Sequence, residues 1–136
     1  MKIIKNAAHF AGIFAIGSAG YGLCETAVRG RTHWSMLLAG GICLVLLVLA
    51  DRKYLPLSIY LRSLYGGLII TAVEFVFGCI FNIILGFEVW DYSHLPFNIM
   101  GQICPKFYII WVLMSFAVFV CRKKLLALCK AEKTAG

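Results

Sequence analysis

Charged residues are scarce in this chain of 136 residues. Only 14% of them are Asp, Glu, Lys or Arg, whereas 62% are hydrophobic. Soluble domains contain about 25% charged and about 45–50% apolar residues. So few charges do not cover the surface of a small soluble fold. The composition therefore excludes that class and indicates a single transmembrane domain over residues 1–136.

The motifs of soluble enzymes are missing as well. The sequence contains no GxGxxG, P-loop, GxSxG or HExxH pattern, so we predict no enzyme, no catalytic residues and no cofactor. The six cysteines show no CxxC spacing, and the three histidines lie far apart. We therefore expect neither disulfides nor a metal site, and we interpret the cysteines as small buried hydrophobic residues.

The net charge of +7 lies in short clusters between apolar runs. This pattern favours the headgroups of a lipid bilayer as the partner and argues against nucleic acid. Four runs approach the roughly 20 apolar residues that cross a bilayer as a helix. Because a backbone in lipid must satisfy its own hydrogen bonds, we predict an all-α, polytopic bundle of four transmembrane helices. The helices are expected at about 7–28, 34–50, 64–87 and 98–121, followed by a basic cytoplasmic tail at 122–136.

The first run has two interpretations. Lys2 and Lys5 before an apolar stretch, followed by "SAG" at 18–20, fit a signal peptide cleaved before Tyr21. We favour an uncleaved helix, because small residues recur along one row and predict close packing against a neighbouring helix. The row contains Ala7, Ala11, Ala15 and Ala19, with Ala8, Gly12 and Gly20 beside it.

Basic residues orient the bundle, because they concentrate on the cytoplasmic side of a membrane. Only Arg29 and Arg31 fall on the opposite side in the predicted map. We therefore expect both termini to be cytoplasmic. The ten residues on the cytoplasmic side are Lys2, Lys5, Arg52, Lys53, Arg62, Arg122, Lys123, Lys124, Lys130 and Lys133.

One carboxylate, Glu74, falls near the middle of the most hydrophobic run. A charge at that depth costs about 2.5–3.5 kcal/mol, so Glu74 must be protonated, paired or in contact with water. Gly78 and Asn82 continue the same helical face. Either this face forms hydrogen bonds between helices that fix the packing, or it serves the passage of a proton or solute. Both interpretations remain open at this stage.

Gln102 and Lys106 lie one turn apart in the predicted fourth helix, which Pro105 should bend. Lys106 would either extend toward the outer surface or pair with Glu74 or Asn82. Its predicted depth places the amine within reach of Glu74 for two long side chains.

The outer end contains further candidates. Glu25 and Arg29 have the i, i+4 spacing of a helical ion pair, and a Glu25 that faces the bundle would join Asn82 and Gln102. The loop "WDYSHLPFN", residues 90–98, predicts a compact segment over the outer mouth.

The loop residues suggest particular roles. Trp90 and Tyr92, together with Trp34, have the alternative interpretation of anchors at the membrane surface. Asp91 is expected to contact Arg29, Arg31 or the start of the fourth helix. Asn98 is expected to cap that helix.

Three stretches resemble the CmpB-type family of ABC-transporter permeases: "GYGLCETAVRGRTHWSMLLAGG" (20–41), "TAVEFVFGCIFNIILG" (71–86) and "VWDYSHLPFNIMGQIC" (89–104). The resemblance extends from about Gly17 to Trp111, and its last stretch is the most specific. Pro105 and Lys106 depart from the apolar continuation expected there. The residues that fit the family pattern are Glu25, Arg29, Glu74, Asn82, Trp90, Asp91, Tyr92, Pro96, Asn98, Gly101 and Gln102.

The resemblance and the composition together predict a transport-related, permease-like membrane subunit, and the resemblance implies the inner membrane of a bacterium. Four helices are too few to enclose a wide path, so we expect a homo-oligomer or a partner membrane subunit, with a separate ATPase if ATP drives the process. The alternative is a membrane scaffold, sensor or regulatory partner without transport activity. A transporter's Glu74 should face a hydrated cavity, whereas a scaffold's should lie in a dry helix interface.

Overall fold

A computed structural model describes residues 2–53 and 56–136. This part of the chain is helical and contains no β-strand, which confirms the expected all-α fold. A π-helical turn, η1, directly follows α3, and a long irregular segment, residues 85–104, precedes α4. The elements are α1 (Lys2–Arg29), α2 (Trp34–Lys53), α3 (Ile59–Phe77), η1 (Gly78–Ile84) and α4 (Pro105–Ala135).

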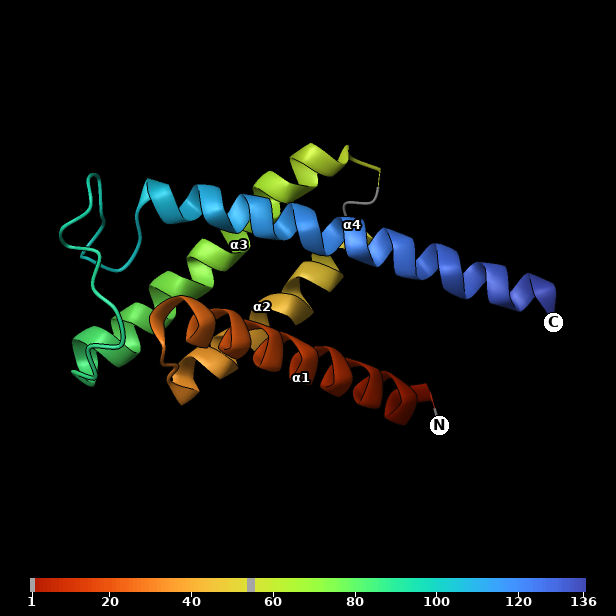
Figure 1. The fold of residues 1–136 in the computed structure, drawn as a ribbon, viewed down its shortest axis with the longest axis horizontal. Coiled ribbons are helices and arrows are strands. Elements are labelled where there is room, and N and C mark those ends of the chain that lie inside the picture. The colour runs from red at the N-terminus through yellow and green to blue at the C-terminus, as the bar shows by residue number, and fades with distance from the viewer. Residues whose placement is uncertain (1, 54–55) are drawn as a thin grey trace.

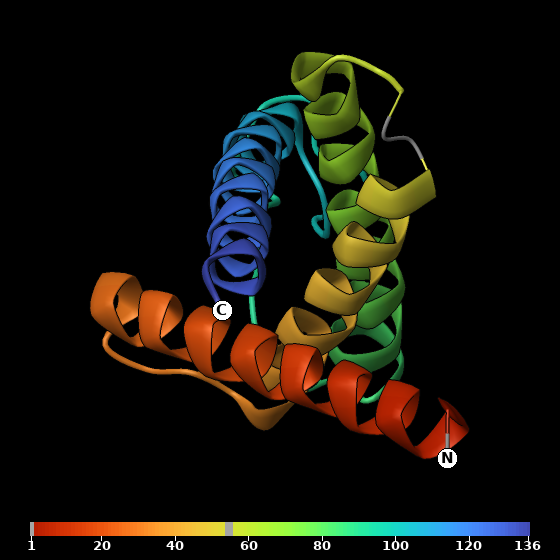
Figure 2. The ribbon, with the colours of Figure 1, turned by 90° about the vertical axis from the view of Figure 1, so that its right-hand side faces the viewer.

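The four long helices pack as two pairs. α1 lies against α2, α3 lies against α4, and contacts between α2 and α3 join the pairs. Both termini lie at one end of the molecule and segment 85–104 lies at the other (Figure 1). Figure 2 shows α1 crossing beneath the other helices. We call the end with the termini the inner end and the end with segment 85–104 the outer end.

Three helices in the described ranges are long and apolar enough to cross a membrane: Ile3–Arg29, Trp34–Lys53 and Ile59–Ile84. α4 is not among them. It begins at Pro105 instead of 98, and it continues through the predicted tail, 122–136, as far as Ala135. Pro105 therefore does not bend the helix. It occupies the first turn, where a missing backbone N–H is tolerated.

α1 packs on α2 through glycines and not through its alanine row. A Cβ atom at Gly17 would lie 2.6 Å from the carbonyl oxygen of Gly40, so the two backbones are in close contact there. Ala11 and Ala15 are exposed, and Gly12 has open space around it. The predicted packing face was wrong because small side chains carry no penalty on a helix face that meets lipid.

α3 and α4 meet in the same manner. A Cβ atom at Gly66 would lie 2.6 Å from the side chain of Ser115, and Gly67 faces Val112. Ser63 and Ser115 are almost completely buried. Small residues at the crossing allow the helices to approach closely, as is typical of helix pairs in membranes.

The interpretation of the cysteines as buried hydrophobic residues was largely wrong. All six thiols are free, and among them only Cys104 is buried. Cys24, Cys121 and Cys129 are exposed on α1 and α4. Apolar surroundings in the sequence therefore did not predict burial of these thiols in the protein.

Candidate functional site

Glu74 lies in the third helix and its side chain is enclosed by protein. Only 6% of the residue is exposed. One carboxylate oxygen accepts a hydrogen bond of 2.8 Å from the hydroxyl of Tyr92, in segment 85–104. The other accepts a hydrogen bond of 2.9 Å from the indole N–H of Trp111, on α4. Both oxygens therefore have a donor, and both donors are neutral.

Aromatic packing holds these donors in place. The ring of Tyr92 stacks on Phe107 with centroids 4.3 Å apart and an angle of 8° between the rings. Phe107 also contacts Trp111, whose other side meets Tyr21 of α1. Because these rings are large and well packed, the positions of the phenol and the indole around Glu74 are fixed before any ligand arrives.

Lys106 does not pair with Glu74. It is exposed in the first turn of α4, and no ion pair in the described ranges includes Glu74. The predicted pair was wrong because the helix starts at Pro105. Lys106 therefore stands at the outer end of α4 and not several turns inside it.

Asn82 connects the end of the third span to segment 85–104. Its side-chain amide donates to the Gln102 side-chain carbonyl over 2.8 Å and to the backbone carbonyl of Trp90 over 3.0 Å. Its own carbonyl accepts a hydrogen bond of 2.7 Å from the backbone N–H of Val89. The predicted face of Glu74, Gly78 and Asn82 thus points toward Gln102, although Gln102 precedes α4 instead of lying on it.

Asn82 lies in an unusual helical turn, η1. η1 is π-helical, with the N–H of Leu85 bonded to the carbonyl of Ile80 over 2.9 Å. π-Helical turns are rare and occur frequently at functional sites. Gly78, which begins this turn, lies directly against Gln102, since a Cβ atom there would be 2.5 Å from the Gln102 side-chain oxygen. The sequence carried no signal for this turn.

Segment 85–104 is compact, as the sequence predicted. Trp90 and Tyr92 are 5% and 4% exposed, and the Trp90 indole N–H donates to the carbonyl of Gln102 over 3.0 Å. The alternative interpretation of these two residues as membrane anchors was therefore wrong. Trp34, which is 52% exposed, is the one of the three that projects outward.

Asp91 and Asn98 act within the segment. Asp91 accepts hydrogen bonds from the side chain and the backbone N–H of Ser93, and these bonds lower the pKa of its carboxyl. Its predicted pairing with Arg29 or Arg31 is not among the ion pairs of the described residues. Asn98 bonds to the carbonyl of Leu95 over 2.8 Å instead of capping α4. The arginine pairing of Asp91 was therefore wrong, whereas its expected contact with the predicted start of the fourth helix is present, since a Cβ atom at Gly101 would lie 3.0 Å from the Asp91 carboxylate. The Asn98 cap was wrong because 98–104 forms turns and not helix.

Glu25 is buried near the outer end of α1, with 8% of the residue exposed. The predicted ion pair with Arg29 is present at 3.4 Å. The hydroxyl of Thr32 adds a hydrogen bond of 2.6 Å. These contacts tie the α1–α2 connection to the helix, and they do not bring Glu25 to Asn82 or Gln102.

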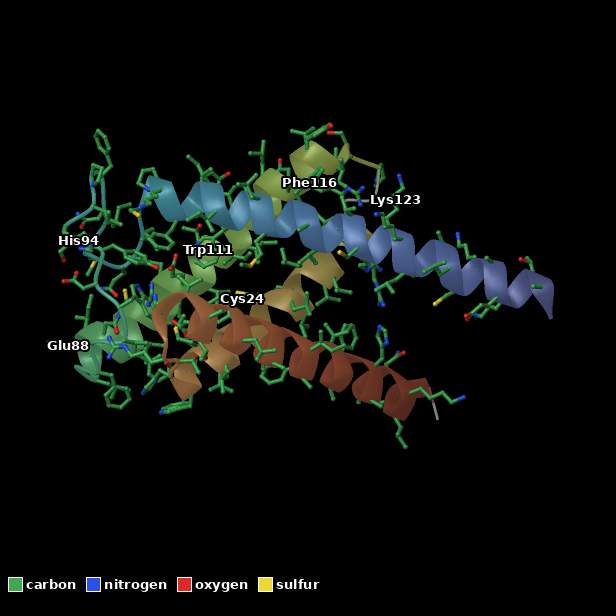
Figure 3. The ribbon with its side chains drawn as sticks, viewed as in Figure 1. Cys24, Glu88, His94, Trp111, Phe116 and Lys123 are labelled. Atoms are coloured by element: carbon green, nitrogen blue, oxygen red, sulfur yellow. The ribbon has the colours of Figure 1, made fainter. Side chains whose placement is uncertain are left out.

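A cavity of about 630 Å³ is bounded by all four long helices, and among the described residues Glu74 is the only acidic one in its wall. Glu74, Tyr21 and Trp111 lie toward the outer end of the wall, and Arg52 and Arg122 lie toward the inner end. Figure 3 shows Trp111 and Cys24 at a similar level along the bundle, with Lys123 farther toward the termini. The arrangement presents one hydrogen-bonded carboxylate to a mainly apolar space.

A second buried carboxylate was not recognised in the sequence. Asp51, at the inner end of α2, is 3% exposed and forms ion pairs with Arg62 of α3 and Arg122 of α4. It therefore connects three helices. The sequence did contain a signal for it. Asp51 ends an apolar run on the side of the predicted bundle that is rich in basic residues, where a buried acid must pair with a cation.

Comparison with known proteins supports the predicted resemblance. No curated protein and no solved structure matched the chain. A family model with the description "Putative ABC-transporter type IV", of the CmpB type, matches residues 21–133. Together with the three membrane-capable helices, this match identifies a multi-pass membrane protein related to ABC transporters. The matched range covers most of the chain, and the protein therefore belongs to this family.

Proposed function

We propose that this protein is the permease-like membrane subunit of a bacterial transport system. The observation that carries the proposal is the position of Glu74, which is the only carboxylate that the described part of the chain contributes to the wall of a cavity bounded by all four long helices. Polar groups placed at this depth are costly and mark the paths of ions or solutes in membrane proteins. Membership of a transporter family supports the same conclusion.

The hydrogen bonds of Glu74 suit such a role. The hydroxyl of Tyr92 and the indole of Trp111 are both neutral donors. A carboxyl group with neutral partners can exchange a proton or meet a cation without leaving a buried positive charge unpaired. Glu74 is therefore a group in the cavity wall that can respond to a cationic solute.

A separate ATPase is part of the proposal. The sequence contains no P-loop, so energy from ATP would come from another chain. The described helices bound a cavity but form only two packed pairs, which supports function as an oligomer or with a partner membrane subunit.

A membrane scaffold, sensor or regulator is the second candidate. It is favoured by the complete hydrogen bonding of Glu74, since a buried acid with two donors is also a packing element. The candidates differ in whether water enters the cavity. Cys43 lies in the cavity wall, whereas Cys104 is buried outside it, and the two thiols provide a matched pair for a test.

The test uses two variants, each with a single cysteine, at position 43 or at position 104. A charged, water-soluble thiol reagent is added to the protein in sealed vesicles. A hydrated transport cavity predicts that Cys43 reacts much faster than Cys104. Equal protection of both thiols would reject the hydrated path and favour the scaffold.

Affinity purification from native membranes tests the partner. The transport proposal predicts that an ATPase subunit co-elutes with the tagged protein. Glu74→Gln should leave that assembly intact while abolishing transport, because it keeps the shape of the side chain and removes the charge. An assembly without an ATPase, or full activity of the variant, would contradict the proposal.

We further propose that four helices cross the membrane and that both termini are cytoplasmic. The concentration of basic residues near the termini, at the end of α2 and at the start of α3 supports this orientation, as does the location of both termini at one end (Figure 1). Reporter fusions after Lys133 and within 51–63 should report cytoplasm, and fusions within 88–97 should report the exterior. An exterior C-terminus would reverse the map.

A further inference from the structure

The cavity is open along α1 and α4. Several side chains in its wall are largely exposed and apolar, among them Ile16 of α1 at 67% and Leu125 of α4 at 61%. α1 packs on α2, and α4 packs on α3. The sides of α1 and α4 that do not meet these partners therefore border a groove and not a closed interface. In a bilayer an open apolar groove of this kind is accessible to acyl chains.

The inner end of the groove carries an excess of positive charge. Asp51 has one negative charge and two guanidinium partners, Arg62 and Arg122. Arg52 also lies in the wall and has no carboxylate partner among the described residues. Its contacts are a ring nitrogen of His9 at 3.2 Å and the ring face of Phe10 at 5.8 Å. An anionic group at this position would find a guanidinium that no acid occupies.

The part of the groove between the two arginines and Trp111 matches one leaflet of a bilayer in length, and the wall continues past Arg122 toward the inner end. From Arg122 to Trp111 along α4 the rise is about 16 Å at 1.5 Å per residue. Half of a hydrocarbon core about 30 Å thick is about 15 Å. A lipid with its headgroup at the two arginines would therefore place the end of its acyl chain near Tyr21 and Trp111, beside Glu74.

We propose that this groove binds an anionic phospholipid from the leaflet at the inner end. Its phosphate contacts Arg52 and Arg122 through charge-assisted hydrogen bonds, and one acyl chain lies between α1 and α4. The proposal does not rest on transport, since a scaffold with this groove would bind the same lipid.

A second copy of the chain fits the groove less well. The inner ends of α1 and α4 both carry lysines, including Lys5, Lys123 and Lys124. A parallel copy would bring these like charges together at the end where the groove is already positive, which is unfavourable. An anionic lipid instead complements this charge.

The experiment measures lipid retained by the full-length protein. The protein is reconstituted with phosphatidylglycerol or with phosphatidylcholine of identical acyl chains, washed in mild detergent, and analysed by native mass spectrometry. We expect one phosphatidylglycerol retained per chain and little phosphatidylcholine. Arg52→Gln should lower the retained phosphatidylglycerol about tenfold, the size of one charge-assisted hydrogen bond.

Two further variants make the test specific. Lys123 is exposed at the same end but lies outside the cavity wall, so Lys123→Gln should leave retention unchanged. Ala117 lies in the wall on α4, and Ala117→Trp should block the acyl chain and reduce retention of either lipid.

Three results would overturn the proposal. Equal loss in Arg52→Gln and Lys123→Gln would indicate general surface attraction. Equal retention of the two lipids would remove the role of the arginines. A lipid-free complex with the mass of two chains would show that a second copy fills the groove.

Discussion

Two of the buried carboxylates of this bundle, Glu74 and Asp51, are stabilised in opposite ways. They are 6% and 3% exposed. Glu74 accepts hydrogen bonds from a phenol and an indole, both neutral, near segment 85–104. Asp51 is bound by two guanidinium groups at the inner end. Burial is almost equal, so the difference between the sites lies in the charge of the partners.

This difference distinguishes an acid held by opposite charges from an acid held by neutral hydrogen-bond donors. Without the Asp51 carboxylate, two arginines would remain close together with no counter-charge, so this ion cluster is a structural one that joins three helices. Glu74 has no such constraint, because neither of its donors is charged. Four substitutions test this comparison, from the largest expected effect to the smallest.

Asp51→Asn should have the largest effect. It removes the counter-charge of Arg62 and Arg122, and breaking a buried ion pair costs about 3–5 kcal/mol. The measurement is the free energy of unfolding in detergent micelles. Asp91→Asn serves as a control, because Asp91 is an exposed acid on the outer segment, and it should change the value little. Equal effects of the two variants would contradict the structural role of Asp51.

Asn82→Ala should have the second-largest effect. It removes hydrogen bonds to Val89, Trp90 and Gln102, each worth about 0.5–1.5 kcal/mol, so the total loss is about 2–4 kcal/mol. Segment 85–104 should become open to hydrogen exchange and to proteases while the inner end remains protected. Loss of protection at both ends would show that the two ends are not independent.

Tyr92→Phe isolates one donor to Glu74. The stacking on Phe107 is retained, and one carboxylate oxygen loses its hydrogen bond, which should cost about 1–3 kcal/mol of unfolding free energy. Combining it with Glu74→Gln in a double-mutant cycle should show coupling between the two residues. Strict additivity would mean that the hydrogen bond has no energetic role.

Arg29→Gln should have the smallest effect. Its ion pair with Glu25 is 3.4 Å long, and the Arg29 side chain is 33% exposed, so a helical pair of this kind contributes about 0.3–0.5 kcal/mol. Glu25 also keeps its hydrogen bond from Thr32. A measured loss above about 1 kcal/mol would exceed the about 0.3–0.5 kcal/mol of a helical ion pair. It would show that this pair resembles the buried ion cluster of Asp51.

The sequence by itself determined the local and additive features. Hydropathy sums over neighbouring residues, so the runs at 7–28, 34–50 and 64–87 predicted helices that the structure contains. The Glu25–Arg29 pair followed from the helical repeat alone. The predicted start of the fourth helix, at residue 98, was wrong. Residues 98–104 are apolar enough for the end of a helix, but they form turns.

The tertiary structure alone decided which groups meet the two carboxylates. Tyr92 and Trp111 are 18 and 37 residues from Glu74 along the chain, and Arg122 is 71 residues from Asp51. No periodicity links such positions. Their contacts arise because glycines and serines set how closely the helices cross, and because Asn82 folds segment 85–104 back over the outer end. An acid in an apolar run therefore predicted, from the sequence, that a partner exists. Only the crossing of the helices determined which residue that partner is.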